Sequence, residues 1–212
     1  MKRTTKTIIA SMLLVSSILM ASCSKDTEES SSTVLGESRD TTTSETTIAQ
    51  ADMKTSYADI MGTYSEPAYV NLNSELTIST PEGWTHLDEE ATSEFWGNDA
   101  LIRKPEDELS FNDVAYESVW KAENGDNMCV MLMYVPGCSA DDYSAVLNTT
   151  EFETVRLGSQ DISVTYSSYD VDGTEIINAR IINYNNDTMT VITINCLTQE
   201  GLDEVLSKIN FS

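Results

Sequence analysis

Basic residues are scarce in this 212-residue chain, which has 12 Lys and Arg against 35 Asp and Glu. Three of the basic residues lie within the first six positions, so the rest of the chain keeps 9 basic residues against 35 acidic ones, a net charge of −26. Binding of DNA, RNA and anionic lipid depends on clustered Lys and Arg. The sequence therefore excludes nucleic acid as a partner, and it excludes membrane attachment through a polybasic patch.

Histidine is nearly absent as well, since His86 is the one histidine of the chain. Nucleophilic sites of the Ser–His–Asp or Cys–His type need an imidazole, and no Gly-x-Ser-x-Gly surrounds any serine. One His and widely spaced Cys also lack the ligand pairing of a zinc site. Carboxylate pairs for glycoside hydrolysis stay open, but no pair is distinguished by context. We expect a non-enzymatic protein without cofactor or metal, and His86 as a surface-loop residue.

The chain has no apolar run long enough to span a bilayer. Thr7 to Ala21 forms an apolar stretch of about 15 residues behind a basic start, whereas a membrane helix needs about 20. The stretch ends in Leu19-Met20-Ala21-Ser22-Cys23. This resembles the lipobox of bacterial lipoproteins, although Met20 stands where that motif usually has Leu. The alternatives are an ordinary secretory signal, for which Ala21-Ser22-Cys23 is a poor cleavage site, and an uncleaved anchor.

The lipobox resemblance implies a specific location for the mature chain. Residues 1–22 would be a lipoprotein signal peptide, and Cys23 would carry diacylglycerol and a fatty acyl chain such as palmitate. Two or more acyl chains anchor a protein durably, whereas one chain is marginal. The expected location is thus a bacterial membrane, lipid-anchored and facing away from the cytoplasm.

Residues 23–50 lack aromatic residues and a periodic apolar face. Of the 27 residues from Ser24 to Gln50, 13 are Ser or Thr and 6 are Asp or Glu. Such a segment cannot offset its ordering entropy by burial, so we expect a disordered tether, with a glycosylated stalk as the alternative. Residues 51–71 have partial helical spacing and a proline, which leaves a linker or a short helix open.

Residues 72–212 alternate between strand patterns and turns and are predicted to form one α+β domain. Asn124-Gly125 between two apolar segments and the short links at Gly158, Asp172-Gly173 and Asn185–Asp187 indicate antiparallel neighbours. Two helices are expected, one from Ser139 and one from Thr198 through Ile209, whose apolar residues share one face; residues 89–97 could form one short helical segment. A brief strand is expected over 100–103. The fold class is an antiparallel sheet flanked by helices.

Two ends of this domain resemble a known family. The segment Leu76-Thr77-Ile78-Ser79-Thr80-Pro81-Glu82-Gly83-Trp84 resembles the opening strand and Pro-x-Gly-Trp turn of PsbP-like domains. The final strand, Thr188 to Leu197, and the amphipathic helix after it are similar to the end of that family. The resemblance implies an α/β/α sandwich around an antiparallel sheet, used mostly as a binding or assembly module.

Few other residues suggest a site. Trp84, Trp96 and Trp120 could line a groove, but large aromatics are usually core anchors; Trp96, beside Gly97, is the candidate for ligand contact. Cys129, Cys138 and Cys196 allow at most one disulfide, and we expect none, with Cys138 the most exposed. Asp170–Glu175 resembles a calcium loop but lacks its anchoring carboxylates, so a hairpin turn is favoured.

The expected function is therefore that of a surface lipoprotein, whose α+β domain binds another protein or a component of the cell envelope. The alternative is a lipoprotein that captures a peptide or glycan through exposed aromatics.

Overall fold

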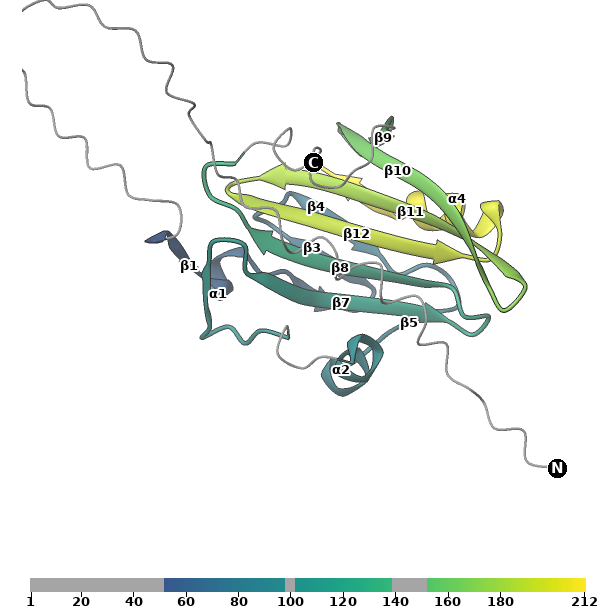
Figure 1. The fold of residues 1–212 in the computed structure, drawn as a ribbon, viewed down its shortest axis with the longest axis horizontal. Helices are drawn as coiled ribbons and strands as arrows, with labels where there is room; N and C mark the ends of the chain where they lie inside the picture. The colour runs from purple at the N-terminus through teal and green to yellow at the C-terminus, as the bar shows by residue number, and fades with distance from the viewer. Residues whose placement is uncertain (1–51, 98–101, 139–151) are drawn as a thin grey trace, which may run out of the picture.

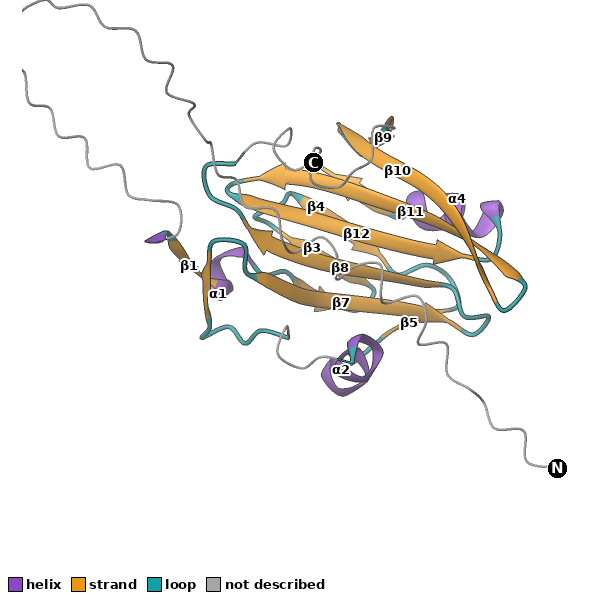
Figure 2. Ribbon diagram, viewed as in Figure 1, coloured by secondary structure: helices purple, strands orange, loops and turns teal. Residues whose placement is uncertain are grey.

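The computed structural model describes residues 52–97, 102–138 and 152–212. The proposed signal peptide, the lipobox cysteine Cys23, the tether over 23–50 and the helix expected from Ser139 lie outside these residues. The described chain is mostly strand, with three short helices (Figure 2). It therefore tests the expectations for the folded domain.

Seven strands form one antiparallel sheet, and four more form a second sheet. The larger sheet has the order β5 (Trp84–His86), β7 (Val114–Ala122), β8 (Asn127–Tyr134), β12 (Thr188–Cys196), β11 (Thr174–Asn185), β10 (Gln160–Val171) and β9 (Glu153–Leu157). The smaller has the order β13 (Ile209–Phe211), β4 (Leu76–Ser79), β3 (Ala68–Asn71) and β2 (Thr63–Ser65). A separate ribbon pairs β1 (Lys54–Ser56) with β6 (Glu108–Ser110). The helices are α1 (Tyr57–Ile60), α2 (Glu89–Trp96) and α4 (Gln199–Leu206).

Tight turns set the antiparallel order of the long strands, as the sequence predicts. Asp172 and Gly173 connect β10 to β11 with φ angles of 53° and 84°, which the two central residues of a type I′ turn require. Asn186 and Asp187 connect β11 to β12 in the same way, with φ angles of 48° and 61°. Between β7 and β8, Gly125 adopts a φ of 104°, and its N–H donates to the Ala122 carbonyl.

The main core lies between the two sheets. Ile181, Ile192 and Ile194 of the larger sheet pack with Ile78 and Phe211 of the smaller one, and all five side chains are buried. Helix α4 adds Leu202 and Val205 to the same cluster. In Figure 1 the smaller sheet lies behind the long strands, and α2 lies beside β7. β8 is apolar on both faces because it lies near the middle of the larger sheet.

Helices α2 and α4, which the sequence also predicts, each begin at a side chain that caps the helix N-terminus. The Asp88 carboxylate accepts a hydrogen bond from the N–H of Ala91 at 2.9 Å, and α2 ends at Gly97 in the left-handed conformation. The Thr198 hydroxyl accepts from the N–H of Gly201 at 3.1 Å at the start of α4. Both starting points agree with the sequence prediction.

Three predictions for individual segments need correction. The sequence allows either a linker or a short helix over residues 51–71. These residues contain a short helix, but they also contribute β1, β2 and β3, so the described fold begins before Leu72. The last helix ends at Leu206, and Ile209 belongs to β13, because the chain there pairs with β4. Ile102 and Arg103, the described part of the strand expected over 100–103, are not in a strand.

The helical cover of the sheet is also smaller than expected. A second sheet, rather than helices alone, covers the inner face of the seven-stranded sheet. The coarse class of an antiparallel α+β domain holds for the described residues. The finer comparison with a helix-flanked sandwich does not describe this inner face.

Candidate functional site

The seven-stranded sheet has an outer face, which we define as the face turned away from the four-stranded sheet. Strand residues alternate between faces, so Ile181 and Ile192 point into the main core while their neighbours point outward. The outer face consists mainly of these residues of the four central strands: Tyr116, Val119, Cys129, Met131, Met133, Met189, Val191, Thr193, Asn195, Asn178, Arg180 and Ile182. It combines an aromatic, an apolar and a polar region.

Trp96 forms the aromatic region together with Tyr116. The two rings stack with centroids 3.9 Å apart and planes inclined by 13°, so α2 is held against β7. Trp96 is partly buried. Its indole N–H is buried and has no hydrogen-bond acceptor among the residues that the structure describes. A buried donor without an acceptor is costly, so this atom is a candidate point of ligand contact.

The apolar region lies next to this stack. Met131, Met133, Met189 and Val191 are buried in one cluster that also contains Val114. Methionine side chains are flexible and polarisable, and they adapt to partners of different shape. Because these side chains are buried, the cluster forms a second apolar core along β8 and β12.

A chain of amides forms part of the polar region. Asn195 accepts a hydrogen bond from Asn178 at 2.8 Å and from the Tyr169 hydroxyl at 3.0 Å, and it donates to Asn127 at 2.9 Å. Asn178 also donates to the carbonyl of Ile194 at 3.2 Å. The contacts join β8, β12, β11 and β10, so these amides hold one another in a fixed arrangement.

Arg180 lies between the amides and the apolar region. It is partly buried, and its register partners are Thr165 on β10 and Thr193 on β12. Burial lowers the pKa of its guanidinium. The electrostatic interaction with the nearby Cys129 side chain opposes this shift. The side chain nevertheless remains a cation at neutral pH, because free arginine titrates far above that range.

A second polar cluster lies on the inner side of β7, at Glu117. A β-bulge between Tyr116 and Ser118 inserts Glu117 as an extra residue and turns it toward the N-terminal strands. Its carboxylate accepts hydrogen bonds from Tyr57 at 2.7 Å, from the Gly62 N–H at 2.9 Å, and from Tyr69. Burial raises the pKa of Glu117, and the three donors oppose that rise. The cluster fastens residues 57–71 to β7.

His86 is a member of an aromatic cluster and not a loop residue. It lies in β5, and its ring stacks on Tyr64 with centroids 3.7 Å apart and planes inclined by 6°. Its Nε2 lies 3.3 Å from the Ser118 hydroxyl, and its ring meets the edge of the buried Trp120. Burial lowers the pKa of His86, which favours the neutral imidazole. Its packing differs from the surface position that the sequence suggested.

The tryptophans and cysteines are mostly structural in the described chain. Trp120 is fully buried, and Trp84 is partly buried against the main core. No disulfide joins Cys129, Cys138 and Cys196 to one another. Cys138, expected to be the most exposed of the three, is buried with 7% of its surface accessible. Burial raises the pKa of both Cys129 and Cys196 to about 12, which disfavours the reactive thiolate.

Within the described ranges, no group of three or more His, Cys, Asp or Glu side chains is placed to hold a metal ion. The segment Asp170–Glu175 forms the β10–β11 hairpin turn, where Asp170 accepts the N–H of Gly173 at 2.9 Å. Among helices of the described chain, none has the length and apolar character needed to cross a bilayer.

Sequence reasoning singled out Trp96 but missed Arg180 and Glu117. Each is a single charged residue inside an apolar strand, within Ile176–Tyr184 and Val114–Trp120 respectively. That interruption of the strand pattern was the available signal. Which face each charge occupies depends on strand register and on the bulge, which the sequence did not reveal.

No protein-family model and no curated protein matches the chain. A crystal structure from Bacteroides thetaiotaomicron is similar over 65% of this chain and 45% of that one, with 8% identity and a TM-score of 0.41. The chain thus spans less than half the length of that protein. The solution structure of cyanobacterial PsbP from Synechocystis is similar over 68% of this chain and 91% of that one, with 11% identity and a TM-score of 0.33. At these values neither structure assigns the chain to a family.

Proposed function

We propose that this protein is a membrane-anchored bacterial surface lipoprotein whose α+β domain is a non-enzymatic binding module for another protein or an envelope component. The observation that carries the proposal is how the two groups best suited to acid–base chemistry are used. His86 is covered by Tyr64, and Glu117 accepts hydrogen bonds from Tyr57 and Gly62 and is further held by Tyr69. Because both groups are committed to packing and to internal hydrogen bonds, their arrangement supports a binding role for the domain.

The anchoring part of the proposal rests on Cys23 and the apolar stretch before it. Cells that express the full chain would be fed a clickable fatty acid, with Cys23→Ala as the variant and Cys129→Ala as the matched control. We expect label on the unmodified chain and on Cys129→Ala, and none on Cys23→Ala. Equal labelling of all three proteins would overturn lipid anchoring.

The binding part is tested by capture from envelope extract. The full mature chain would be immobilised in non-ionic detergent, and recovered proteins and glycans would be identified by mass spectrometry. We expect one partner to be enriched, and Tyr116→Ala, which removes the support of the Trp96 stack, to lower its recovery. Recovery of small ligands with no enriched protein or envelope polymer would contradict the leading proposal.

A second candidate function is capture of a peptide or glycan through Trp96. The observation that favours it is the buried indole N–H without an acceptor beside the Tyr116 ring. Trp96→Phe keeps a ring for stacking but removes this donor. If the donor contacts a solute, Trp96→Phe weakens binding while the unfolding temperature stays close to that of the unmodified protein; equal binding by both proteins argues against this role.

The resemblance to PsbP-like domains also remains a proposal. It is supported by the strand β4 with its Pro81–Trp84 turn and by the succession of β12 and α4. The second sheet on the inner face is the feature that this proposal must accommodate.

A further inference from the structure

Arg180 lies on the outer face of the larger sheet and is partly buried. It lies on β11, with β10 and β12 on either side, and the strand residues next to it, Ala179 and Ile181, are fully buried in the main core. The Thr165 and Thr193 backbones fix its position across the sheet. The guanidinium group therefore projects from a rigid support rather than from a loop.

Arg180 has no acidic partner, although the chain contains 35 carboxylates. The ion pairs between described residues use Lys54, Arg103 and Arg156, each with an Asp or Glu. Arg180 takes part in none of them, and no acceptor for its N–H groups is found among the described residues. A partly buried charge without a partner loses hydration without full compensation.

The chemistry of the group identifies what would compensate this charge. A guanidinium presents a planar fork of N–H donors that matches the two oxygens of a carboxylate or phosphate. The Asn178 amide, two residues earlier on the same face, and the flanking threonines make the surroundings polar. The apolar cluster that contains Val191 lies next to Arg180, on the side away from Asn178.

We propose that Arg180 anchors a binding site for an oxyanion, a carboxylate or phosphate group carried by the ligand of the outer face. The inference rests on the proposed binding function and names the charge that the ligand brings to this face. The negative charge of the whole chain repels free anions, so the rest of a larger ligand, beyond its anionic group, must supply further favourable contacts.

Nuclear magnetic resonance of arginine side chains tests this site directly. The full mature chain, labelled with ¹⁵N in non-ionic detergent, would be titrated with sodium acetate and, separately, with inorganic phosphate, at constant ionic strength set with NaCl. We expect a saturable shift of the Arg180 Nε–H resonance with at least one anion. A shift with acetate alone assigns a carboxylate, and a shift with phosphate alone assigns a phosphate. No saturable shift with either anion would overturn the proposal.

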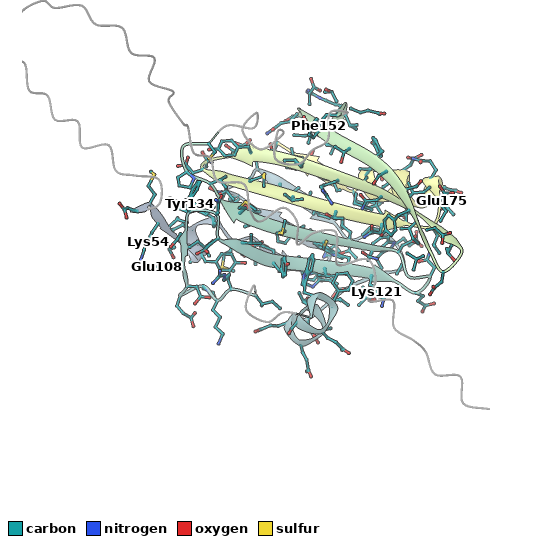
Figure 3. All side chains as sticks on the ribbon, in the orientation of Figure 1. Lys54, Glu108, Lys121, Tyr134, Phe152 and Glu175 are labelled. Carbon is teal, nitrogen blue, oxygen red and sulfur yellow. The ribbon has the colours of Figure 1, made fainter. Side chains whose placement is uncertain are left out.

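Three variants separate recognition by Arg180 from a general effect of charge. Arg180→Gln should weaken anion affinity about ten-fold or more, because the bidentate charged contact is lost. Lys121→Gln removes the same charge from an exposed position near the end of β7 (Figure 3) and should leave affinity within about two-fold, a factor too small for a lost direct contact. Equal loss in both variants would contradict a specific site.

The third variant, Arg180→Met, keeps the length of the side chain but removes its charge. It should abolish the anion shift and raise the unfolding temperature by several degrees, because a partly buried unpaired charge is removed. A lower unfolding temperature would mean that the arginine stabilises the fold, which contradicts a residue kept for binding. Envelope capture that survives Arg180→Gln would leave the binding function standing while placing the partner elsewhere.

Discussion

At the scale of single residues, Glu117 shows how one backbone irregularity determines a contact network. The bulge places its carboxylate between the hydroxyls of Tyr57 and Tyr69 instead of leaving it on the sheet surface. Asn71 adds a polar contact beside this network, since its side-chain amide donates to the carbonyl of Ile60 at 2.9 Å. The N-terminal strands are thereby attached to the larger sheet through polar contacts.

The raised pKa of Glu117 predicts a pH dependence of stability. In the unfolded chain this carboxyl ionises near pH 4.5, whereas in the folded chain it keeps its proton to higher pH. As pH rises through this interval, the unfolded state loses its proton first, so the contribution of Glu117 to the free energy of unfolding decreases. The difference in that free energy between the unmodified protein and Glu117→Gln should therefore fall as pH rises from about 4 to 7, the interval over which the two states differ in bound protons.

Urea unfolding at a series of pH values measures this difference. Glu123→Gln is the control, since Glu123 lies exposed in the β7–β8 turn, and its difference should stay nearly constant. A difference for Glu117→Gln that rises with pH would mean that the tyrosine hydrogen bonds outweigh the cost of burial.

At the scale of elements, close approach of β3 to the loop after α1 depends on a glycine. A Cβ atom at Gly62 would lie 2.2 Å from the Cζ atom and from the hydroxyl oxygen of Tyr69, which is fully buried. Gly62→Ala should therefore destabilise the protein by about 1–3 kcal/mol through overpacking.

Gly201 provides the matched control for that substitution. It lies in α4, where a Cβ atom would come no closer than 3.3 Å to its neighbours, and alanine favours a helix by about 1 kcal/mol. Thermal unfolding of both variants measures the contrast. Similar unfolding temperatures for Gly62→Ala and Gly201→Ala would contradict the tight contact with Tyr69.

The strand β13 gives the second prediction at this scale. Phe211 is fully buried in the main core, and its carbonyl accepts the N–H of Ser159 at 2.8 Å. Phe211→Ala should lower the free energy of unfolding by about 3–5 kcal/mol because it leaves a cavity. Its exposed neighbour is the control: Asn210→Ala should change the free energy by less than about 0.5 kcal/mol. Comparable losses in urea unfolding would mean that β13 is not part of the core.

Sequence reasoning succeeded where an element is determined by nearby residues. The hairpins at Gly125 and at Asp172-Gly173 follow from local turn chemistry, and α4 follows from its start at Thr198 and its apolar face. It failed for Ile209, whose strand forms only because Ile78, far away in the chain, pairs with it. The short strands β1, β2 and β3 depend on distant partners in the same way. The local sequence of residues 51–71 therefore indicates only a linker or a short helix.

The same distinction between local and distant determinants applies to the candidate site. Trp96 could be chosen from the sequence, because a tryptophan beside a glycine stands out, but its stacking on Tyr116 depends on how α2 packs. The roles of Arg180 and Glu117 depend on register and on a bulge. These are properties of the assembled sheet, so no local pattern determines them.

At the scale of the whole molecule, the net charge of −23 predicts a response to salt. Repulsion between like charges destabilises the compact state, and raising ionic strength from about 0.01 M to 1 M shortens the screening length from about 30 Å to 3 Å. The unfolding temperature should rise by several degrees over this range in NaCl.

Calorimetry of the full mature chain measures this response, and KCl serves as the control for effects of a particular cation. The two salts should give the same rise, because screening depends on ionic strength. An unfolding temperature that stays constant or falls would mean that the few ion pairs, such as the one between Lys54 and Glu108 in the β1–β6 ribbon (Figure 3), outweigh the repulsion.

The contact between Gly158 and Phe211 joins the two sheets along one side through a parallel bridge. On the other side, β2 and β5 meet through the rings of Tyr64 and His86, and no described backbone hydrogen bonds pair these two strands. The sandwich should therefore open about the bridged side when it fluctuates. In deuterated solvent, amides of β2 and β5 should exchange before those of β13, and the reverse order would show that the bridge is the weaker seam.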